Sequence, residues 1–165
     1  MPLVIFFSVL LGLFTLELMD PVQIWVIQPI TAGIAHVSAS LLQLFDSTVH
    51  AQGILISNRE TGQAVSIQPG CNGVEAMICL TAAVMATPAT WRQRLFGLGI
   101  GYLAIQALNI LRVISLFYLL QWNQVWFEWA HLYLWQALII LDGLIVYLLW
   151  LRTLNRVQTT ETAPA

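Results

Sequence analysis

Long apolar segments, separated by short polar connections, make up most of this chain. Four of them approach the about 20 residues that a helix needs to cross a bilayer: residues 2–19, 73–88, 95–120 and 130–151. Charged residues are rare within them. We therefore predict an all-α, polytopic membrane protein with about four transmembrane helices.

A further segment, residues 22–45, is long enough to cross the membrane but has a different pattern. Its large apolar residues recur every three or four positions, with polar residues between them: Ile30, Ile34, Val37, Leu41 and Leu44. One apolar stripe is typical of a helix that lies in the membrane interface or packs against other helices. We predict such an amphipathic or membrane-embedded helix here, and the pattern leaves open whether it crosses the bilayer.

Part of the chain has the alternating pattern of β-structure. Apolar positions alternate with polar ones in residues 53–57 and again in residues 63–67, and residues 58–62 between them are rich in turn-forming residues. These features predict a small extracytoplasmic β-hairpin. The hairpin leads directly into the apolar segment that begins at residue 73.

The composition agrees with a membrane protein. Hydrophobic residues make up 59% of the 165 residues and charged residues only 8%, whereas a soluble domain carries about a quarter charged residues. We predict a single integral membrane domain over residues 1–156 and a disordered cytoplasmic tail over residues 157–165, which are mostly polar. The net charge of −2 excludes the basic surface that nucleic-acid binding requires.

The arginines indicate which side of the membrane each connection faces. Arg92 and Arg94 lie between the second and third predicted spans, and Arg152 and Arg156 follow the fourth. Short connections rich in arginine stay in the cytoplasm, and two spans separate the two clusters, so both fall on one side. The predicted hairpin then lies on the outer side.

Three reactive side chains lie near the outer side in this arrangement. Cys71 comes just before the second span, His131 opens the fourth, and Arg112 lies 17 residues into the third, about 25 Å from its inner end. An arginine within an apolar span costs roughly 2.5–3.5 kcal/mol on insertion scales and marks a functional site by default. A thiol, a guanidinium and an imidazole at one depth indicate an enzyme.

The position of Cys71 predicts a nucleophile. Unpaired amides and the dipole at a helix start favour an anion and would lower the pKa of the thiol, and Arg112 would add to this effect. His131 would act as general base and then general acid. Arg112 would stabilise either the thiolate or the oxyanion that forms when a carbonyl is attacked.

Five further residues are candidates for supporting this chemistry: Asn72, Gly73, Glu75, Asn109 and Glu128. The first two directly follow the thiol. Glu128, three residues before His131, would orient the imidazole if both share a helix face. Glu75 would either match the helix dipole or touch the substrate. Asn109 would hydrogen-bond Arg112 one helical turn later.

Each of these residues alone also has a structural interpretation. A lone cysteine in an apolar chain is usually a small buried hydrophobe, which is our interpretation of Cys79. An arginine near the interface often only extends its charge to the headgroups. The combination of three residue types at one depth favours catalysis. Because the chain has no C-x-x-C motif, we expect neither a metal nor another cofactor.

The order and spacing of these motifs resemble a known family. Cys71-Asn72-Gly73, then Asn109-Ile110-Leu111-Arg112, then His131 are similar to the signatures of the exosortase and archaeosortase family, most like the small exosortase H type. The resemblance implies a multi-pass cysteine transpeptidase of the bacterial inner membrane, with its active site on the periplasmic side. Its substrates would be exported proteins that end in a sorting motif, a membrane helix and a basic cluster.

We therefore expect a membrane cysteine protease or transpeptidase that cleaves a C-terminal sorting tail through a thioacyl-enzyme. The catalytic residues would be Cys71, Arg112 and His131, and the partners would be exported proteins and the lipid bilayer. The alternative is a non-catalytic membrane subunit that binds an anionic lipid or a partner helix. A membrane thiol oxidoreductase is disfavoured because the chain has no second cysteine close to Cys71.

Overall fold

The computed structural model describes the backbone of residues 1–161 and the side chains of residues 1–154. Helical segments account for most of this part of the chain, and three short strands interrupt them. The helices are α1 (Pro2–Glu17), α2 (Asp20–Val22), η1 (Gln23–Ile27), α3 (Gln28–Leu42), α4 (Val74–Ala86), α5 (Trp91–Trp122), α6 (Gln124–Trp129), η2 (Ala130–Leu134) and α7 (Trp135–Glu161). The strands are β1 (Val49–Gln52), β2 (Leu55–Asn58) and β3 (Ala64–Ser66).

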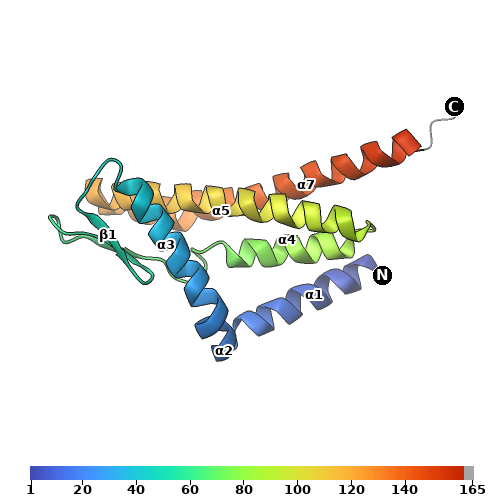
Figure 1. Ribbon diagram of the computed structural model, residues 1–165, viewed down its shortest axis with the longest axis horizontal. Helices are drawn as coiled ribbons and strands as arrows, with labels where there is room; N and C mark the ends of the chain where they lie inside the picture. The colour runs from blue at the N-terminus through green and yellow to red at the C-terminus, as the bar shows by residue number, and fades with distance from the viewer. Residues whose placement is uncertain (162–165) are drawn as a thin grey trace.

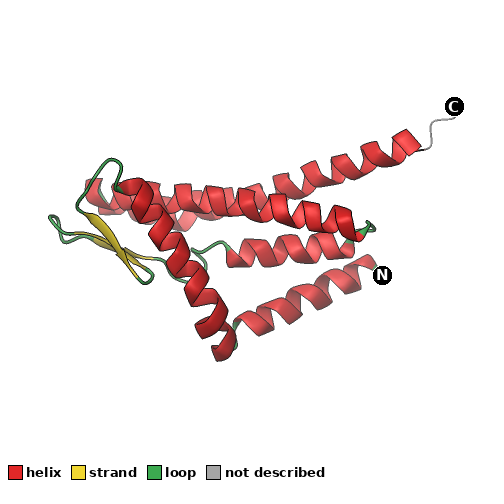
Figure 2. Cartoon of the chain, viewed as in Figure 1, coloured by secondary structure: helices red, strands yellow, loops and turns green. Residues whose placement is uncertain are grey.

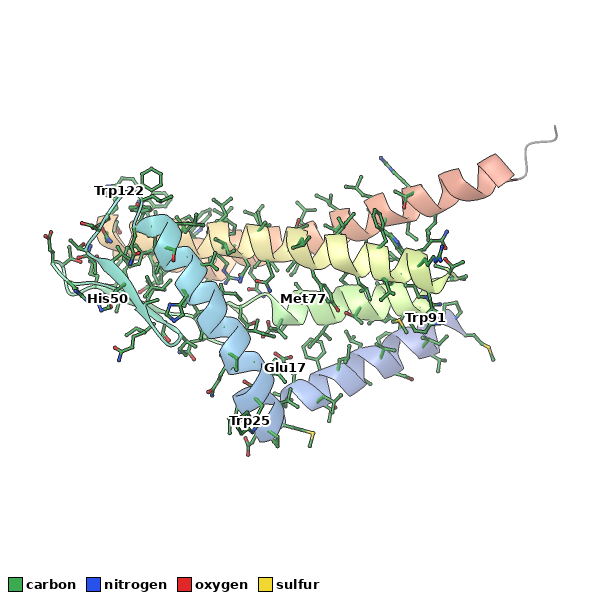
Figure 3. The ribbon with its side chains drawn as sticks, in the orientation of Figure 1. Glu17, Trp25, His50, Met77, Trp91 and Trp122 are labelled. Carbon is green, nitrogen blue, oxygen red and sulfur yellow. The ribbon has the colours of Figure 1, made fainter. Side chains whose placement is uncertain are left out.

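The helix α4 lies between α1 on one side and the pair α5 and α7 on the other (Figure 1), and it contacts all three. The strands gather at one end of the molecule (Figure 2), which we call the sheet end. The opposite end holds the amino terminus and the turn between α4 and α5. We call it the arginine end, after Arg92, Arg94 and Arg152. Trp91 and Trp122 mark the two ends of α5 (Figure 3).

Three helices are long and apolar enough to cross a membrane. They cover Asp20–Leu42, Trp91–Trp122 and Gln124–Leu154, with 23, 32 and 31 residues. The other two predicted spans are shorter helices, α1 with 16 residues and α4 with 13. Thirteen residues extend only about 20 Å, less than the about 30 Å of a hydrocarbon core. The expected number of four spans is therefore not confirmed. The multi-pass helical architecture is confirmed.

The shortness of α4 follows from the residues at its ends. Gly73, its N-cap, has a φ of +76°, and Thr87 at its C-cap is extended with ψ of 133°. Pro88 comes next, and a proline disfavours helical backbone in the residue before it. The following helix α5 begins at Trp91, and its N-cap residue Thr90 forms a capping box with Gln93.

The helix α3 runs obliquely from the end of α1 to the sheet (Figure 1), and most of its apolar stripe lies outside its buried face. Of the predicted stripe only Ile34 is buried, while Ile30, Val37 and Leu41 are exposed. The buried face is made mainly of small residues: Thr31, Ala35, Ser38 and Ala39. In a bilayer large apolar side chains can face lipid, and small residues let helices approach closely. Most of the apolar stripe therefore faces outward, which agrees with the first of the two arrangements that the pattern allowed, a stripe in contact with the membrane.

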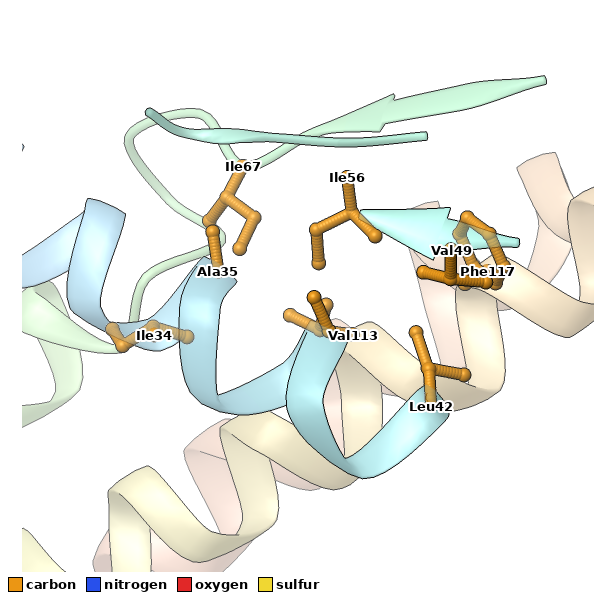
Figure 4. Close-up of a cluster of buried hydrophobic side chains, with 9 residues drawn as sticks. Ile34, Ala35, Leu42, Val49, Ile56, Ile67, Val113 and Phe117 are labelled. Carbon is orange, nitrogen blue, oxygen red and sulfur yellow. The ribbon is translucent and has the colours of Figure 1, made fainter. Parts of the chain in front are cut away.

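The strands form one antiparallel sheet in the order β1-β2-β3. The predicted hairpin corresponds to β2 and β3, in which Ile56 pairs with Val65. The strand β1 was not predicted; it pairs with β2 through a tight turn at Gly53, whose φ is +59°. Figure 4 shows Ile56 of β2 above Val113 of α5, and Ile67, which follows β3, next to Ala35 of α3; all four belong to a cluster that fixes the sheet on the helices.

Close helix packing sets the position of α5 against its neighbours. At Gly101 a Cβ atom would lie 2.3 Å from Leu80 Cδ2, and at Gly97 it would lie 2.5 Å from Trp150 Nε1. Both distances are too short for a normal contact, so a larger residue at either position would force Leu80 or Trp150 to move. The Trp150 indole also donates a hydrogen bond of 2.9 Å to the Gln93 carbonyl. These contacts pack α4 and α7 against α5, and α4 and α7 also contact each other.

The last helix, α7, continues to Glu161. No glycine or proline interrupts the chain between Gly143 and Pro164, so nothing in the sequence ends the helix earlier. It includes residues 157–161, the first part of the segment that we expected to be disordered. Residues 162–165 lie outside the described residues.

Candidate active site

Three segments that are distant in sequence bring Cys71, Arg112 and His131 together. Cys71 lies in the turn before α4, Arg112 in α5, and His131 in the π-helical turn η2. The Cys71 Sγ atom is 3.4 Å from Arg112 Nη2 and 3.9 Å from His131 Nε2. The thiol–imidazole distance lies within the loose hydrogen-bond range expected of an unliganded catalytic pair. The three side chains line one cavity of about 250 Å³.

Arg112 is buried rather than extended toward the membrane surface. Only 2% of the residue is exposed. Its Nη1 donates to the Gly70 carbonyl at 3.3 Å, and its Nη2 donates to the Cys71 sulfur. Its Nε has no hydrogen-bond partner within residues 1–154. The planar guanidinium therefore holds both the backbone and the sulfur of one turn, and its charge faces the thiol.

The turn that carries Cys71 is fixed by Asn72, which is fully buried. The Asn72 Nδ2 donates to Thr31 Oγ1 at 3.2 Å, and its Oδ1 accepts from the Val74 amide at 3.0 Å. Its backbone carbonyl accepts from Gln106 Nε2 at 3.1 Å. One residue thus ties the turn to α3, α4 and α5, which positions the neighbouring thiol.

Gly73 is required by both its backbone and its surroundings. Its φ of +76° lies in the left-handed region, and a Cβ atom there would approach Gln106 Nε2 at 3.2 Å. Asn109 lies against the same glycine, with its Cγ 3.5 Å from that Cβ position. Asn109 is fully buried, yet neither of its amide atoms has a hydrogen-bond partner in residues 1–154. The expected hydrogen bond between Asn109 and Arg112 is therefore not formed, and Asn109 instead packs beneath the turn.

The imidazole of His131 is oriented by an aromatic ring instead of a carboxylate. Phe127 stacks on His131 with ring centroids 5.7 Å apart and an interplanar angle of 1°. Glu128 is exposed and accepts a hydrogen bond from Gln124 at 3.2 Å. The expected contact between Glu128 and His131 is absent, because the residue four positions before the histidine, Phe127, occupies that face. His131 Nδ1 has no partner among the described side chains.

Glu75 lies in the first turn of α4, and its carboxylate accepts a hydrogen bond from the Gly70 amide. It also lines a second, larger cavity of about 490 Å³ between α4, α7 and α1. Cys79 is exposed and lines this second cavity rather than the first. The two cavities lie on either side of the Gly70–Cys71 turn.

The pKa of the Cys71 thiol is shifted in the direction opposite to our expectation. Burial raises it above the ordinary value, the positive charge of Arg112 only partly offsets this effect, and the Glu75 carboxylate adds to the rise. Cys71 lies two residues before the N-cap Gly73, and the dipole effect falls off within the first turn. A thiol that keeps its proton needs a base at the moment of reaction, and His131 is in place for this.

Sequence reasoning missed three residues that support the site. Phe127 is four residues before His131, a spacing that places two residues on one helix face, so its role was within reach of the sequence. Thr31 and Gln106 each contact Asn72 from another helix, and no local pattern marks them. Among the side chains of residues 1–154, no group of three or more histidine, cysteine or acidic residues could hold a metal ion.

Comparison with known proteins gives one match. A model of a family described as transmembrane exosortase matches residues 3–154, which include all of the residues described above. No curated protein and no solved structure matches the chain.

Proposed function

Because the chain belongs to the transmembrane exosortase family, we propose that it is a membrane cysteine transpeptidase. It would cleave the C-terminal sorting tail of exported, membrane-anchored proteins. One observation carries the proposal: the Cys71 sulfur lies in a cavity between the guanidinium of Arg112, at 3.4 Å, and the imidazole of His131, at 3.9 Å. These are a nucleophile, a fixed cation and a base in contact.

The first half of the reaction forms a thioester. His131 Nε2 takes the thiol proton as the Cys71 sulfur bonds to the carbonyl carbon of the scissile peptide. The carbonyl oxygen becomes an oxyanion, and Arg112 stabilises it. The carbon–nitrogen bond then breaks, and the imidazolium returns its proton to the leaving amine. The membrane helix leaves with a new amino terminus, and the exported protein stays on Cys71 as a thioester.

The second half transfers the exported protein to an acceptor. An amine or water attacks the thioester carbon while His131 takes a proton from it. The carbon–sulfur bond breaks, the sulfur regains a proton from the imidazolium, and the free enzyme is restored. Both halves pass through an oxyanion next to Arg112. A charge held in a buried site stabilises such an oxyanion more strongly than the same charge would in water.

The burial of Arg112 favours this function over the binding of a lipid headgroup. Its two terminal nitrogens are engaged with the Gly70 carbonyl and the Cys71 sulfur. A guanidinium that served an anionic lipid would instead reach the membrane interface. The Gly70 carbonyl and the Cys71 thiol are neutral, so they do not balance the charge of the buried Arg112. During the reaction, the thiolate and then the oxyanion would provide the negative charge beside it.

The orientation in the membrane is part of the proposal. Arg92, Arg94 and Arg152 lie at the arginine end, and such residues favour the cytoplasmic side. The sheet end and the site would then face the periplasm, across the inner membrane of a bacterium. In intact cells, and in a background in which Cys71 and Cys79 are both replaced by alanine, a membrane-impermeant maleimide should label a Glu60→Cys variant, at an exposed position beside the sheet, and not a Gln93→Cys variant. The reverse pattern would place the site in the cytoplasm and overturn the proposed substrate class.

The two cysteines provide a matched test of the nucleophile. The substrate is an exported reporter that ends in a sorting tail from the same source, and processing is followed by the ratio of cleaved to uncleaved reporter. Cys71→Ala should abolish processing, because no other thiol lies near Arg112 and His131. Cys79→Ala should leave it within about twofold, because Cys79 does not line the cavity that holds Arg112 and His131 and alanine is no larger than cysteine. Equal loss in both variants, at equal protein levels, would indicate a packing defect instead.

A further inference from the structure

The second cavity is an apolar groove that begins at the catalytic turn. Gly70 lines its upper end, and the same residue contacts Arg112 through its carbonyl and Glu75 through its amide. The opposite end is lined by Tyr147 of α7. From Gln136 to Tyr147, both of which line the groove, α7 rises about 16 Å. The groove therefore runs from the depth of the thiol toward the arginine end, over about half of a bilayer core.

The side of the groove formed by α4 consists mainly of small residues. Gly73, Ala76, Cys79 and Ala83 line it at helical spacing. Small residues at such spacing allow the backbone of another helix to approach closely, which is how helices associate in membranes. Gly143 of α7 faces the same space, and a Cβ atom built there has nothing within 4 Å. The groove is open at this point.

We propose that this groove holds the membrane helix of the protein that is cleaved, packed between α1 and α7 against α4. This inference rests on the proposed function, because it assigns a place to the substrate class named there. With the substrate helix in the groove, the substrate residues that precede this helix would lie at the Gly70–Cys71 turn. Polar groups gather at that end of the groove, in Glu75 and Gln136, where the substrate backbone stops being helical. The scissile bond is thereby delivered to Cys71 at a fixed depth.

Filling the groove tests the proposal without touching the catalytic residues. Gly143→Leu places a side chain in the groove, and Gly99→Leu is the matched control. A Cβ atom at Gly99 also has nothing within 4 Å, but that residue lies on α5 and does not line the groove. The substrate is the tail-bearing reporter. Alkylation of Cys71 by iodoacetamide, a small reagent, reports separately on whether the catalytic cavity is intact.

Gly143→Leu should reduce processing of the anchored reporter at least tenfold and leave the alkylation rate of Cys71 unchanged. Gly99→Leu should behave like the native protein in both measurements. Normal processing by Gly143→Leu would overturn the proposal. An equal loss of processing in both glycine variants would overturn the proposal as well, because the loss would then come from a general disturbance of the helix bundle and not from a filled groove.

Cross-linking through the native Cys79 tests the occupant directly. In a Cys71→Ala variant Cys79 is the one remaining cysteine, and single cysteines are placed along the membrane helix of the reporter. A short bismaleimide should cross-link Cys79 to positions that recur every three to four residues, beginning about two turns after the scissile bond. A variant Leu103→Cys, Cys71→Ala, Cys79→Ala is the control, because Leu103 is 74% exposed on α5.

The outcomes separate this inference from the proposed function. Periodic cross-links at Cys79 and none at the Leu103 position would support the groove as the helix site, whether or not Cys71 is the nucleophile. Equal cross-linking at both positions would overturn the groove. So would labelling of Cys79 by a photoactivatable phospholipid with no reporter cross-links, since the occupant would then be lipid. Loss of processing in Cys71→Ala alone would still support the proposed function.

Discussion

The two cavities beside the Gly70–Cys71 turn differ in almost every property. The smaller one, of about 250 Å³, brings a thiol, a buried guanidinium and an imidazole together from three segments. The larger one, of about 490 Å³, is lined mainly by apolar and small residues of α4 and α7. Chemistry requires fixed polar groups in a water-poor site, whereas a membrane helix requires an apolar groove that lets a backbone approach. The Gly70–Cys71 turn contributes to both cavities because it lies between them.

The short helix α4 creates this boundary. It has 13 residues and its neighbour α5 has 32, so their lengths are about 20 Å and about 48 Å. The chain before α4 therefore reaches the bundle well below the sheet end of α5. Ile67 and Val113, both buried, belong to the cluster that covers the turn from the sheet side. Cys71 is partly buried as a result, while Gly70 beside it stays exposed at the start of the groove.

Replacing Arg112 should give the largest effect among substitutions that keep Cys71. Lysine keeps the positive charge but lacks the planar fork that contacts the Gly70 carbonyl and the Cys71 sulfur together. We expect Arg112→Lys to insert normally and to lose processing by about 10²-fold or more, the effect typical of removing an oxyanion donor. The measurement is the cleaved fraction of the reporter at matched enzyme levels.

Arg112→Lys should impair the reaction in the smaller cavity and leave binding in the larger cavity intact. Cross-linking of Cys79 to the substrate helix should persist in Arg112→Lys, because the groove is unchanged. Processing close to the native level would remove Arg112 from the catalytic set and leave a Cys–His pair to account for the chemistry.

A smaller effect is expected for the orientation of His131. Phe127→Leu removes the ring that stacks on the imidazole and should lower the turnover rate about tenfold, as misplaced catalytic groups do. Phe127→Tyr retains the ring and should restore most of the rate. Glu128→Gln should have almost no effect, since Glu128 contacts Gln124 and not the histidine. A larger loss in Glu128→Gln than in Phe127→Leu would reverse this assignment.

Much of the architecture could be predicted from the sequence, because it depends on local pattern. The helices around residues 95–120 and 130–151, and the pairing of β2 with β3, follow from hydrophobic length and from alternation. The site residues Cys71, Arg112 and His131 were found through chemistry that is rare in apolar segments. Their closeness could be inferred from a shared depth in the membrane, without knowledge of the packing.

What could not be predicted depends on contacts between distant segments. The strand β1 contains His50 and Gln52, and its sequence alone is too polar to predict a strand. It is a strand because its backbone pairs with β2. The stripe on α3 would be apolar whether it faced lipid or another helix. Its pattern therefore could not show which face of the helix is buried. The pKa of Cys71 is raised by burial under chain segments that its own neighbours in sequence do not reveal.

The central claim is that Cys71 carries the exported protein as a thioester. The direct measurement is mass spectrometry of enzyme mixed with saturating tail-bearing reporter and quenched in acid during turnover. The adduct should map to the peptide that contains Cys71, with the mass of the reporter cleaved at its sorting motif, and hydroxylamine should release it. The Cys79 peptide should remain unmodified in the same sample. Turnover without an adduct on Cys71, or with an adduct on Cys79 instead, would contradict the mechanism.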